Sequence, residues 1–216
     1  MDMSFAEFLE TRWELLLELS IEHIILVLVS VGISTAIGVL VGVLTYETDR
    51  PREISLAIAG SFLTIPSLAL FGLFLVWFGL GVAPVIIALV MYGLLPVLRN
   101  TIVGLREVDS AVVESAQGMG MGRVRRLLKI ELPLAWPVIL TGMRVSTLLI
   151  IGIAAIGAYI NGPGLGEEIF SGIARVGTPI AVNLVLGGML GIIVLAILFD
   201  LLFVLINRLT TSRGLR

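Results

Sequence analysis

Residues that could do chemistry are few in this chain. The 216 residues include one histidine, no cysteine and a single lysine, Lys129. Without cysteine, disulfides, thiolate metal sites and cysteine nucleophiles are excluded. The lysine lies in LLKIEL and not in the GxxxxGK[ST] pattern that cradles nucleotide phosphates, so any ATP chemistry needs another chain. The sequence holds no Ser–His–Asp constellation and no clustered metal ligands. We therefore expect a protein that is not an enzyme.

The polar stretch that holds this lysine predicts two short helices joined by a turn. It reads ESAQGMGMGRVRRLLKIELP over 114–133. Asp109 or Ser110 can cap a first helix over AVVESAQ, and Gly118 is suited to end that helix in the left-handed conformation. The letters MGMG favour a tight turn, because glycine permits close backbone approach. We predict an exposed loop over 109–133.

The second helix of this loop is expected from about Arg123 to Glu131. It ends before Pro133 in this prediction, because the residue before a proline avoids the helical region. An ordinary cytosolic loop rich in positive charge is the alternative, and the residue types leave both readings open. The basic side chains on the second helix are Arg123, Arg125, Arg126 and Lys129.

The elements that hold this loop are membrane-spanning helices. Hydrophobic residues make up 58% and charged residues 14% of the chain, against about 25% charged in an average soluble domain. Several uncharged runs are long enough to cross the hydrocarbon core as helices. We predict an all-α membrane protein with a transmembrane domain over 23–206. Its spans are expected at about 24–45, 54–78, 82–99, 136–158 and 181–206.

Positive charge sets the predicted topology. If the 109–133 loop is cytoplasmic, eleven of the fourteen Lys and Arg residues lie on that side, as the positive-inside rule requires. The N-terminus is then outside and the C-terminus inside (N-out/C-in), with an outer loop over 159–180 and a cytoplasmic tail over 207–216. Residues 1–22 have apolar and acidic faces at helical spacing. They predict an amphipathic surface helix outside, which either packs on the spans or serves as a docking surface.

Ionisable residues within the predicted spans are rare. Arg144 and Asp200 lie within about two turns of a cytoplasmic end, so we expect snorkelling or pairing there. His23 is expected at the outer membrane interface and not on a metal. Pro66 and Pro96 should kink spans two and three, because each removes a helix hydrogen bond. Whether these kinks line a pathway or only shape packing stays open.

The polar loop resembles the EAA loop of ATP-binding-cassette (ABC) importer permeases, whose pattern is roughly E-A-A-x-x-x-G followed by I-x-L-P. Glu114 and Ala116 match its first and third positions, and Ser115 replaces the middle alanine. We match Gly118 to its glycine, with a second glycine at Gly120. The end of the pattern is matched by Ile130, Leu132 and Pro133.

Other segments extend this resemblance over most of the chain. TIPSLALFGL, GLLPVLRNT and IGAYINGPGLGEEIFSGI resemble segments of permeases that import quaternary-amine osmoprotectants, such as glycine betaine, carnitine, choline or proline betaine. Relatives often read IGAGGLG at the outer loop, where this chain has Tyr159, Asn161 and Pro163. The methionine-importer permeases share the fold and the EAA loop, but the first two segments favour the osmoprotectant group.

The resemblance implies a five-span type I ABC importer permease fold in a prokaryotic plasma (inner) membrane. The loop would be the coupling helix, docked in a groove of a cytosolic ATPase. ATP and Mg would sit on that partner, and this chain would hold no cofactor. An extracytoplasmic binding protein would deliver substrate, and a second permease, identical or homologous, would complete the pathway. Nucleic acid has no role. The residues assigned to coupling are Glu114, Ser115, Ala116, Gly118, Gly120, Gly122, Arg123 and Arg126.

The resemblance also suggests roles for single residues. Glu114 would contact the ATPase, Ala116 would permit its close approach, and Gly118 would set the turn. Gly122 stands where many relatives carry Ser or Thr as a helix cap. The basic side would meet either the ATPase or anionic lipid headgroups. Candidates for a pathway or gate are Pro66, Ser67, Tyr92, Pro96, Tyr159 and Asn161. Candidates for docking the binding protein are Glu167, Glu168 and Arg175, unless the outer loop is only a solvated or re-entrant helix.

Two alternatives to an osmoprotectant importer remain. An ABC permease for another small solute, such as a methionine-type amino-acid importer, would share the coupling loop. A secondary transporter is disfavoured, because such proteins usually place ionisable residues in their spans. The binding protein is expected to be a separate chain, since the sequence ends ten residues after the last predicted span.

Overall fold

The computed structural model describes residues 4–211, and this part of the chain is built of helices and turns. Residues 1–3 of the predicted surface helix and 212–216 of the predicted tail lie outside the described residues. The long helices are α1 (Phe5–Thr45), α2 (Asp49–Thr64), α3 (Ser67–Phe78), α4 (Val82–Arg106), α7 (Leu132–Gly157) and α9 (Ala181–Thr210). The short ones are α5 (Ser110–Gly118), α6 (Arg123–Arg126), the π-helix η1 (Leu127–Glu131), the 3-10 turn η2 (Ala158–Ile160) and α8 (Gly166–Ala174).

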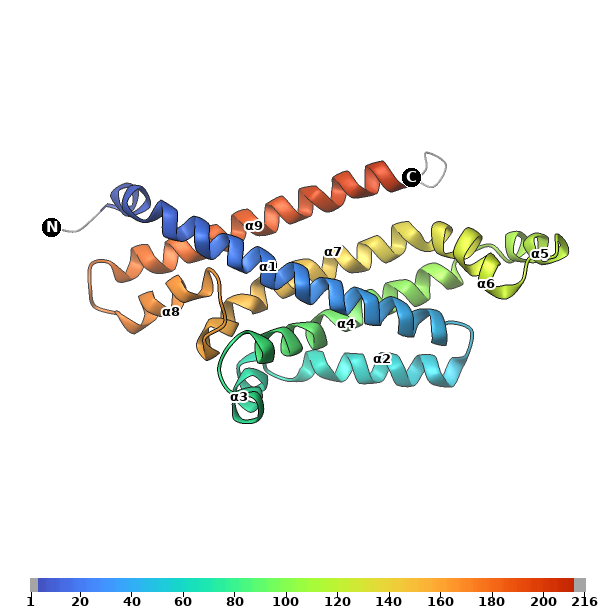
Figure 1. Ribbon diagram of the computed structural model, residues 1–216, viewed down its shortest axis with the longest axis horizontal. Coiled ribbons are helices and arrows are strands. Elements are labelled where there is room, and N and C mark those ends of the chain that lie inside the picture. Colours follow the sequence, from blue (N-terminus) through green and yellow to red (C-terminus); the bar gives the residue numbers. More distant parts are fainter. Residues whose placement is uncertain (1–3, 212–216) are drawn as a thin grey trace.

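Five of the long helices, α1, α2, α4, α7 and α9, run roughly along one axis of the molecule, and α3 lies across them. α5 and α6 lie at one end and α8 lies near the other (Figure 1). Within residues 4–211, four helical stretches are long and apolar enough to cross a membrane, and the bent pair α2–α3 would make a fifth. The prediction of an all-α chain with several apolar spans is confirmed. The count of five and the orientation stay predictions.

Small residues let α1, α4 and α7 pack closely at the centre. A Cβ on Gly93 of α4 would lie 2.6 Å from Oγ of Ser34 in α1 and 2.7 Å from Oγ of Ser146 in α7. A Cβ on Gly142 of α7 would lie 2.7 Å from the carbonyl oxygen of Pro96. Helices in lipid gain little hydrophobic free energy by associating, so close contact at small residues holds them together. This centre positions the polar loop, because α4 leads into it and α7 leads out.

The N-terminal segment is not a separate helix, which differs from the prediction for 1–22. α1 is continuous through this segment and the first span. The sequence turns from acidic to apolar there, but no Gly or Pro between Phe5 and Val31 would end a helix. Phe8 is fully buried, and its ring fills the space beside Gly187 of α9. The segment therefore packs on the other helices, one of its two predicted roles.

The second predicted span is broken and not merely kinked. The axes of α2 and α3 differ by 95°. Pro66 is the N-cap of α3, where its missing N–H costs no helix hydrogen bond. The Tyr92 hydroxyl of α4 donates a hydrogen bond of 2.7 Å to the carbonyl oxygen of Ile65 in the bend. The chain therefore bends next to Pro66, more sharply than the predicted kink, and one span over 54–78 stays a prediction.

Two other prolines lie inside helices that were expected to end or kink. The predicted stop before Pro133 is wrong, because α6, η1 and α7 form one continuous helical stretch. In η1 the Leu132 N–H bonds to the carbonyl oxygen of Leu127, five residues back. This wider turn relieves the crowding that a proline ring imposes on the carbonyl four residues earlier. α4 likewise runs through Pro96 without a break.

Two ionisable sites, the Arg144–Asp200 pair and His23, lie in or next to the predicted spans. Arg144 and Asp200 pair as predicted, joining α7 to α9 with Nε and Nη2 at 2.6 and 2.7 Å from the carboxylate oxygens. His23 is fully buried, and its predicted position at the outer membrane interface stays a prediction. Its Nε2 lies 3.1 Å from the carbonyl oxygen of Ile151, and its side chain packs against Gly164 of the outer loop. This loop folds over α1, which the sequence pattern of α1 alone does not reveal.

Candidate functional site

The polar loop, here called the hairpin (109–133), is built as two helical arms around a tight reversal. Asp109 caps α5 as predicted, its carboxylate accepting a hydrogen bond of 2.8 Å from the Ala111 N–H. Beyond α5, the Met121 N–H donates to the carbonyl oxygen of Ala116 at 3.1 Å. Gly122 precedes α6 without a side-chain cap. The local sequence thus folds this loop largely through its own hydrogen bonds.

The left-handed residue of the reversal is Gly120, not Gly118 as predicted. Gly118 is the last residue of α5, whereas Gly120 has a φ of 79°. The prediction was wrong because α5 continues through Gly118 and the reversal takes place two residues later. Counting E-A-A-x-x-x-G from Glu114 also puts the final glycine of the pattern at Gly120.

The exposed surface of the hairpin is partly apolar, which the sequence analysis overlooked. Glu114 and Ser115 are exposed, but Ala116 is 1% exposed and packs inside the hairpin. Its small side chain therefore packs within the turn, and the predicted close approach of a partner at Ala116 stays a prediction. Met119 is 71% and Val124 is 68% exposed. Both side chains are therefore free to contact another molecule.

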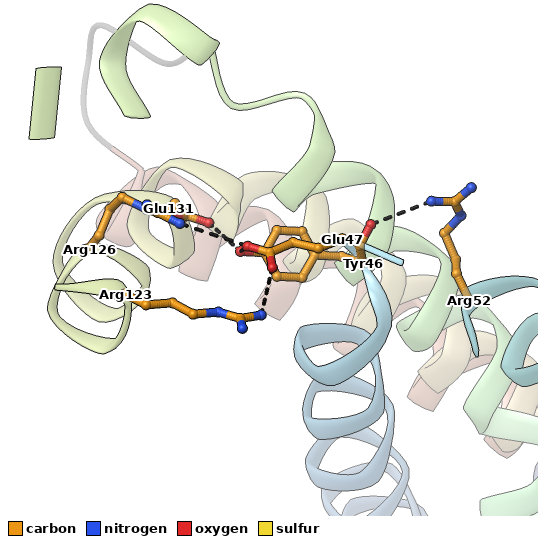
Figure 2. A network of polar contacts seen from close by, with 6 residues as sticks. All are labelled: Tyr46, Glu47, Arg52, Arg123, Arg126 and Glu131. Atoms are coloured by element: carbon orange, nitrogen blue, oxygen red, sulfur yellow. Dashed lines mark hydrogen bonds and ion pairs between the residues drawn. The ribbon is translucent and has the colours of Figure 1, made fainter. Parts of the chain in front are cut away.

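A network of polar side chains joins the hairpin to the end of α1, as Figure 2 shows. Glu131 accepts a hydrogen bond of 2.5 Å from Nε of Arg126 at one carboxylate oxygen and one of 2.7 Å from the Tyr46 hydroxyl at the other. Glu47 pairs with Nη2 of Arg123 at 2.6 Å. Tyr46 and Glu47 directly follow α1, and the other three residues belong to the hairpin. The two elements are thus linked by side chains far apart in sequence.

Arg126 and Glu131 are the buried ion pair of this network. Glu131 is 2% and Arg126 9% exposed. The hydrogen bond to Glu131 raises the pKa of the Arg126 guanidinium, so it stays charged. Burial raises the pKa of the Tyr46 hydroxyl well above its usual range, and the neighbouring carboxylates of Glu131 and Glu47 add to the rise. Arg126 is therefore directed at carboxylates of its own chain and not at a partner or at lipid.

The outer-loop candidates for docking separate into buried and exposed residues. Glu168 is 3% exposed and pairs with Arg12 of α1 at 2.8 Å, so it is not available at the surface. Glu167 and Arg175 are exposed. Partial burial, with Glu22 and Glu168 nearby, raises the pKa of Glu167.

The six pathway or gate candidates lie in two places. At the α2–α3 bend, the buried Tyr92 uses its hydroxyl to hold the backbone. In the outer loop, Asn161 is left-handed with a φ of 59°, and the half-exposed Tyr159 ring lies 6.1 Å from the Phe170 ring. The bend and the adjacent part of α4 hold Pro66, Ser67, Tyr92 and Pro96, and the outer loop holds Tyr159 and Asn161.

Comparison with known proteins decides the class. Residues 34–212 match the family of the binding-protein-dependent transport system inner membrane component. The chain belongs to this family. It is a permease subunit of an ABC importer, a multi-pass membrane protein and a transporter component, not an enzyme. The matched region contains the hairpin, and it also contains Tyr46 and Glu47, which join the end of α1 to the hairpin.

Relatives of this permease match it over nearly its whole length. It is 35% identical over 211 residues to the choline transport system permease protein OpuBB of Bacillus subtilis, covering 98% of this chain and 95% of the relative. It is 34% identical over 209 residues to the glycine betaine/carnitine/choline transport system permease protein OpuCB of the same organism, covering 97% and 94%. It is 37% identical over 206 residues to the osmoprotectant import permease protein OsmW of Salmonella typhimurium, covering 93% and 94%.

A solved structure shares the permease's fold. A crystal form of the MetNI methionine ABC transporter in an inward-facing conformation contains a chain that matches with a TM-score of 0.81. The match covers 94% of this chain and 99% of that chain at 23% sequence identity. At this identity the likeness shows an ABC permease fold.

Proposed function

We propose that this permease imports quaternary-amine osmoprotectants, the class that includes glycine betaine, carnitine, choline and proline betaine. The observation that carries the proposal is the full-length similarity to permeases named for choline, carnitine, glycine betaine and osmoprotectant transport. The likeness to the methionine transporter is in fold only. A methionine-type importer is therefore the second candidate.

The test is ATP-dependent uptake into vesicles that contain the permease with its co-purified ATPase and binding protein. Labelled choline, glycine betaine, carnitine and methionine are compared at equal concentration, with ATP omitted as the control. We expect uptake of at least one quaternary amine and none of methionine. Uptake of methionine alone would overturn the substrate class while leaving the permease class intact.

The partners of the permease follow from the same proposal. A separate cytosolic ATPase carries ATP and Mg and receives the hairpin in a groove, a second permease completes the pathway, and a binding protein delivers substrate outside. The exposed apolar side chains of Met119 and Val124 support this docking, since a partner would cover them. We expect Met119→Asp to reduce co-purification of the ATPase, whereas Glu107→Gln, at an exposed polar site just before the hairpin, should not.

We further propose five spans with the N-terminus outside and the C-terminus inside. The basic residues clustered at the hairpin end of the molecule support this orientation. Because the chain has no cysteine, single cysteines report sidedness without background. Ser115→Cys should react with a membrane-impermeant maleimide only in inside-out vesicles. Val176→Cys, which is 80% exposed in the outer loop, should react only in right-side-out cells, and the reverse pattern would invert the topology.

A further inference from the structure

Two side chains at the end of α1 carry its link to the hairpin. The Tyr46 hydroxyl lies 2.7 Å from an oxygen of Glu131 and 2.9 Å from an oxygen of Glu47. Glu47 reaches Nη2 of Arg123 at 2.6 Å and Nη2 of Arg126 at 3.8 Å. Tyr46 and Glu47 thus engage different hairpin residues, so the junction is held at two points.

At Glu131, burial indicates that the contact between the hairpin and the end of α1 serves geometry more than stability. Removing charged groups from water costs about as much free energy as their pairing returns, so buried ion pairs add little net stability. The Glu47–Arg123 pair is exposed, and exposed ion pairs also add little stability. A broken buried pair is costly, however, because it leaves a charge unpaired. One carboxylate oxygen of Glu131 contacts Arg126 within the hairpin, and the other contacts Tyr46 at the end of α1. If α1 slid or rotated against the hairpin, this buried carboxylate would lose a partner.

The π-helix η1 sets the hairpin side of this junction. Arg126 directly precedes η1, and Glu131 ends it. The wider π-turn brings residues five apart onto one side of the helix, where the two side chains pair. η1 continues directly into α7, so the hairpin, α7 and the end of α1 meet at Glu131.

We propose that Tyr46 and Glu47 are positioning residues for energy coupling. They attach the end of α1 to the hairpin, so that a movement that the ATPase imposes on the hairpin moves α1 with it. The inference rests on the proposed docking of the hairpin to the ATPase, and it assigns a task to residues outside the EAA pattern. Their task is to transmit movement, since neither contacts substrate or nucleotide in this inference.

The test severs the junction and leaves each arm of the hairpin intact. Tyr46→Phe removes one hydroxyl and keeps the ring, and the Arg126–Glu131 pair remains. Glu47→Gln removes the charge that Arg123 meets, and the double variant removes both links. The matched control is Asp49→Asn, because Asp49 begins α2 two residues after Glu47 and pairs with Arg52 of the same helix at 2.5 Å, away from the hairpin side chains. The readouts are co-purified ATPase, ATP hydrolysed, and solute imported per ATP hydrolysed.

We expect the double variant to assemble with the ATPase and to hydrolyse ATP like the wild type, but to import several-fold less solute per ATP. Each single variant should fall between the double variant and the wild type, and Asp49→Asn should match the wild type. Unchanged import per ATP in the double variant would overturn the proposal. A loss of ATPase binding in proportion to the loss of import would also overturn it, because the residues would then only support the hairpin's fold.

A second experiment replaces the noncovalent contacts at the junction with a covalent bridge. Glu47→Cys with Arg123→Cys removes the exposed link between the hairpin and the end of α1 in a chain that has no other cysteine, and a short bismaleimide then bridges the two positions. Import per ATP should be low before bridging and should recover after it. Import that stops on bridging would show that α1 and the hairpin must separate during the cycle, contrary to the proposal.

Failure of the proposed function gives a different result. Import by each variant is measured with the solute that the wild-type complex imports. The test of the junction therefore remains valid if that solute is not a quaternary amine. If the wild-type permease does not bind an ATPase through its hairpin, Met119→Asp will not reduce co-purification, and the docking proposal fails before the junction variants are compared.

Discussion

Gly120 is the residue of the hairpin whose backbone least tolerates a side chain. Its φ of 79° lies in the left-handed region, which costs an L-residue about 1 kcal/mol. We expect Gly120→Ala to distort the reversal and to lower import, with the membrane helices still folded. Gly118→Ala is the matched control, because Gly118 is helical and a Cβ there meets no atom within 4 Å. Equal import by the two variants would contradict the role assigned to Gly120.

The buried carboxylate of Glu168 predicts that the stability of the outer loop depends on pH. Its burial raises its pKa, although Arg12 and Arg175 oppose this, and one of its oxygens has no hydrogen-bond partner. The folded state therefore binds a proton at Glu168 more tightly than the unfolded state does. The cost of the charged carboxylate is present above the folded-state pKa and disappears as pH falls below the unfolded-state pKa.

The substitution Glu168→Gln tests whether the charged carboxylate lowers the stability of the folded protein. Glu168→Gln removes the charge and retains an oxygen that can accept from Arg12. We expect the variant to unfold at a higher temperature than the wild type at neutral pH, with the difference shrinking as pH falls into the acidic range. The measurement is the apparent unfolding temperature in nanodiscs at several pH values. A difference that grows towards low pH would show that the pair with Arg12 outweighs the burial.

At the scale of elements, the pair Arg144–Asp200 joins α7 to α9 with two short hydrogen bonds. Such bidentate, charge-assisted contacts are the stronger kind. We expect Arg144→Ala and Asp200→Ala each to lower the unfolding temperature, and the double variant to lower it little further. The corresponding coupling free energy should be roughly 0.5–3 kcal/mol. Additive effects would mean that the two side chains act independently.

The sequence predicted the elements better than their boundaries. Uncharged runs indicated the long helices, and Asp109 indicated the start of α5, because capping is local chemistry. Prolines were less informative. Pro66 breaks a span and Pro133 lies within a continuous helix, since the outcome depends on whether the neighbouring turn can widen. The network at Glu131 was not predicted, because Tyr46 is distant in sequence and only packing brings it near.

At the scale of the whole molecule, α1 reaches from the outer loop to the hairpin. It pairs through Arg12 with Glu168 in the outer loop, and the residues directly after it meet the hairpin at Glu131. Its 41 residues would extend about 60 Å as a helix. The predicted division into a surface helix and a first span concealed this continuity, because composition changes along α1 while its backbone does not.

A continuous helix fixes the rotational phase between its ends. One inserted residue turns everything beyond it by about 100°, so Arg12 and Tyr46 could no longer both face their partners. We expect a single alanine inserted after Leu28 to abolish import, whereas Leu28→Ala, at a site 53% exposed, should be tolerated. Import by the insertion variant would show that one of the two contacts is dispensable. Along the exposed face of α1, the kind of side chain can therefore change, but the number of residues between Arg12 and Tyr46 cannot.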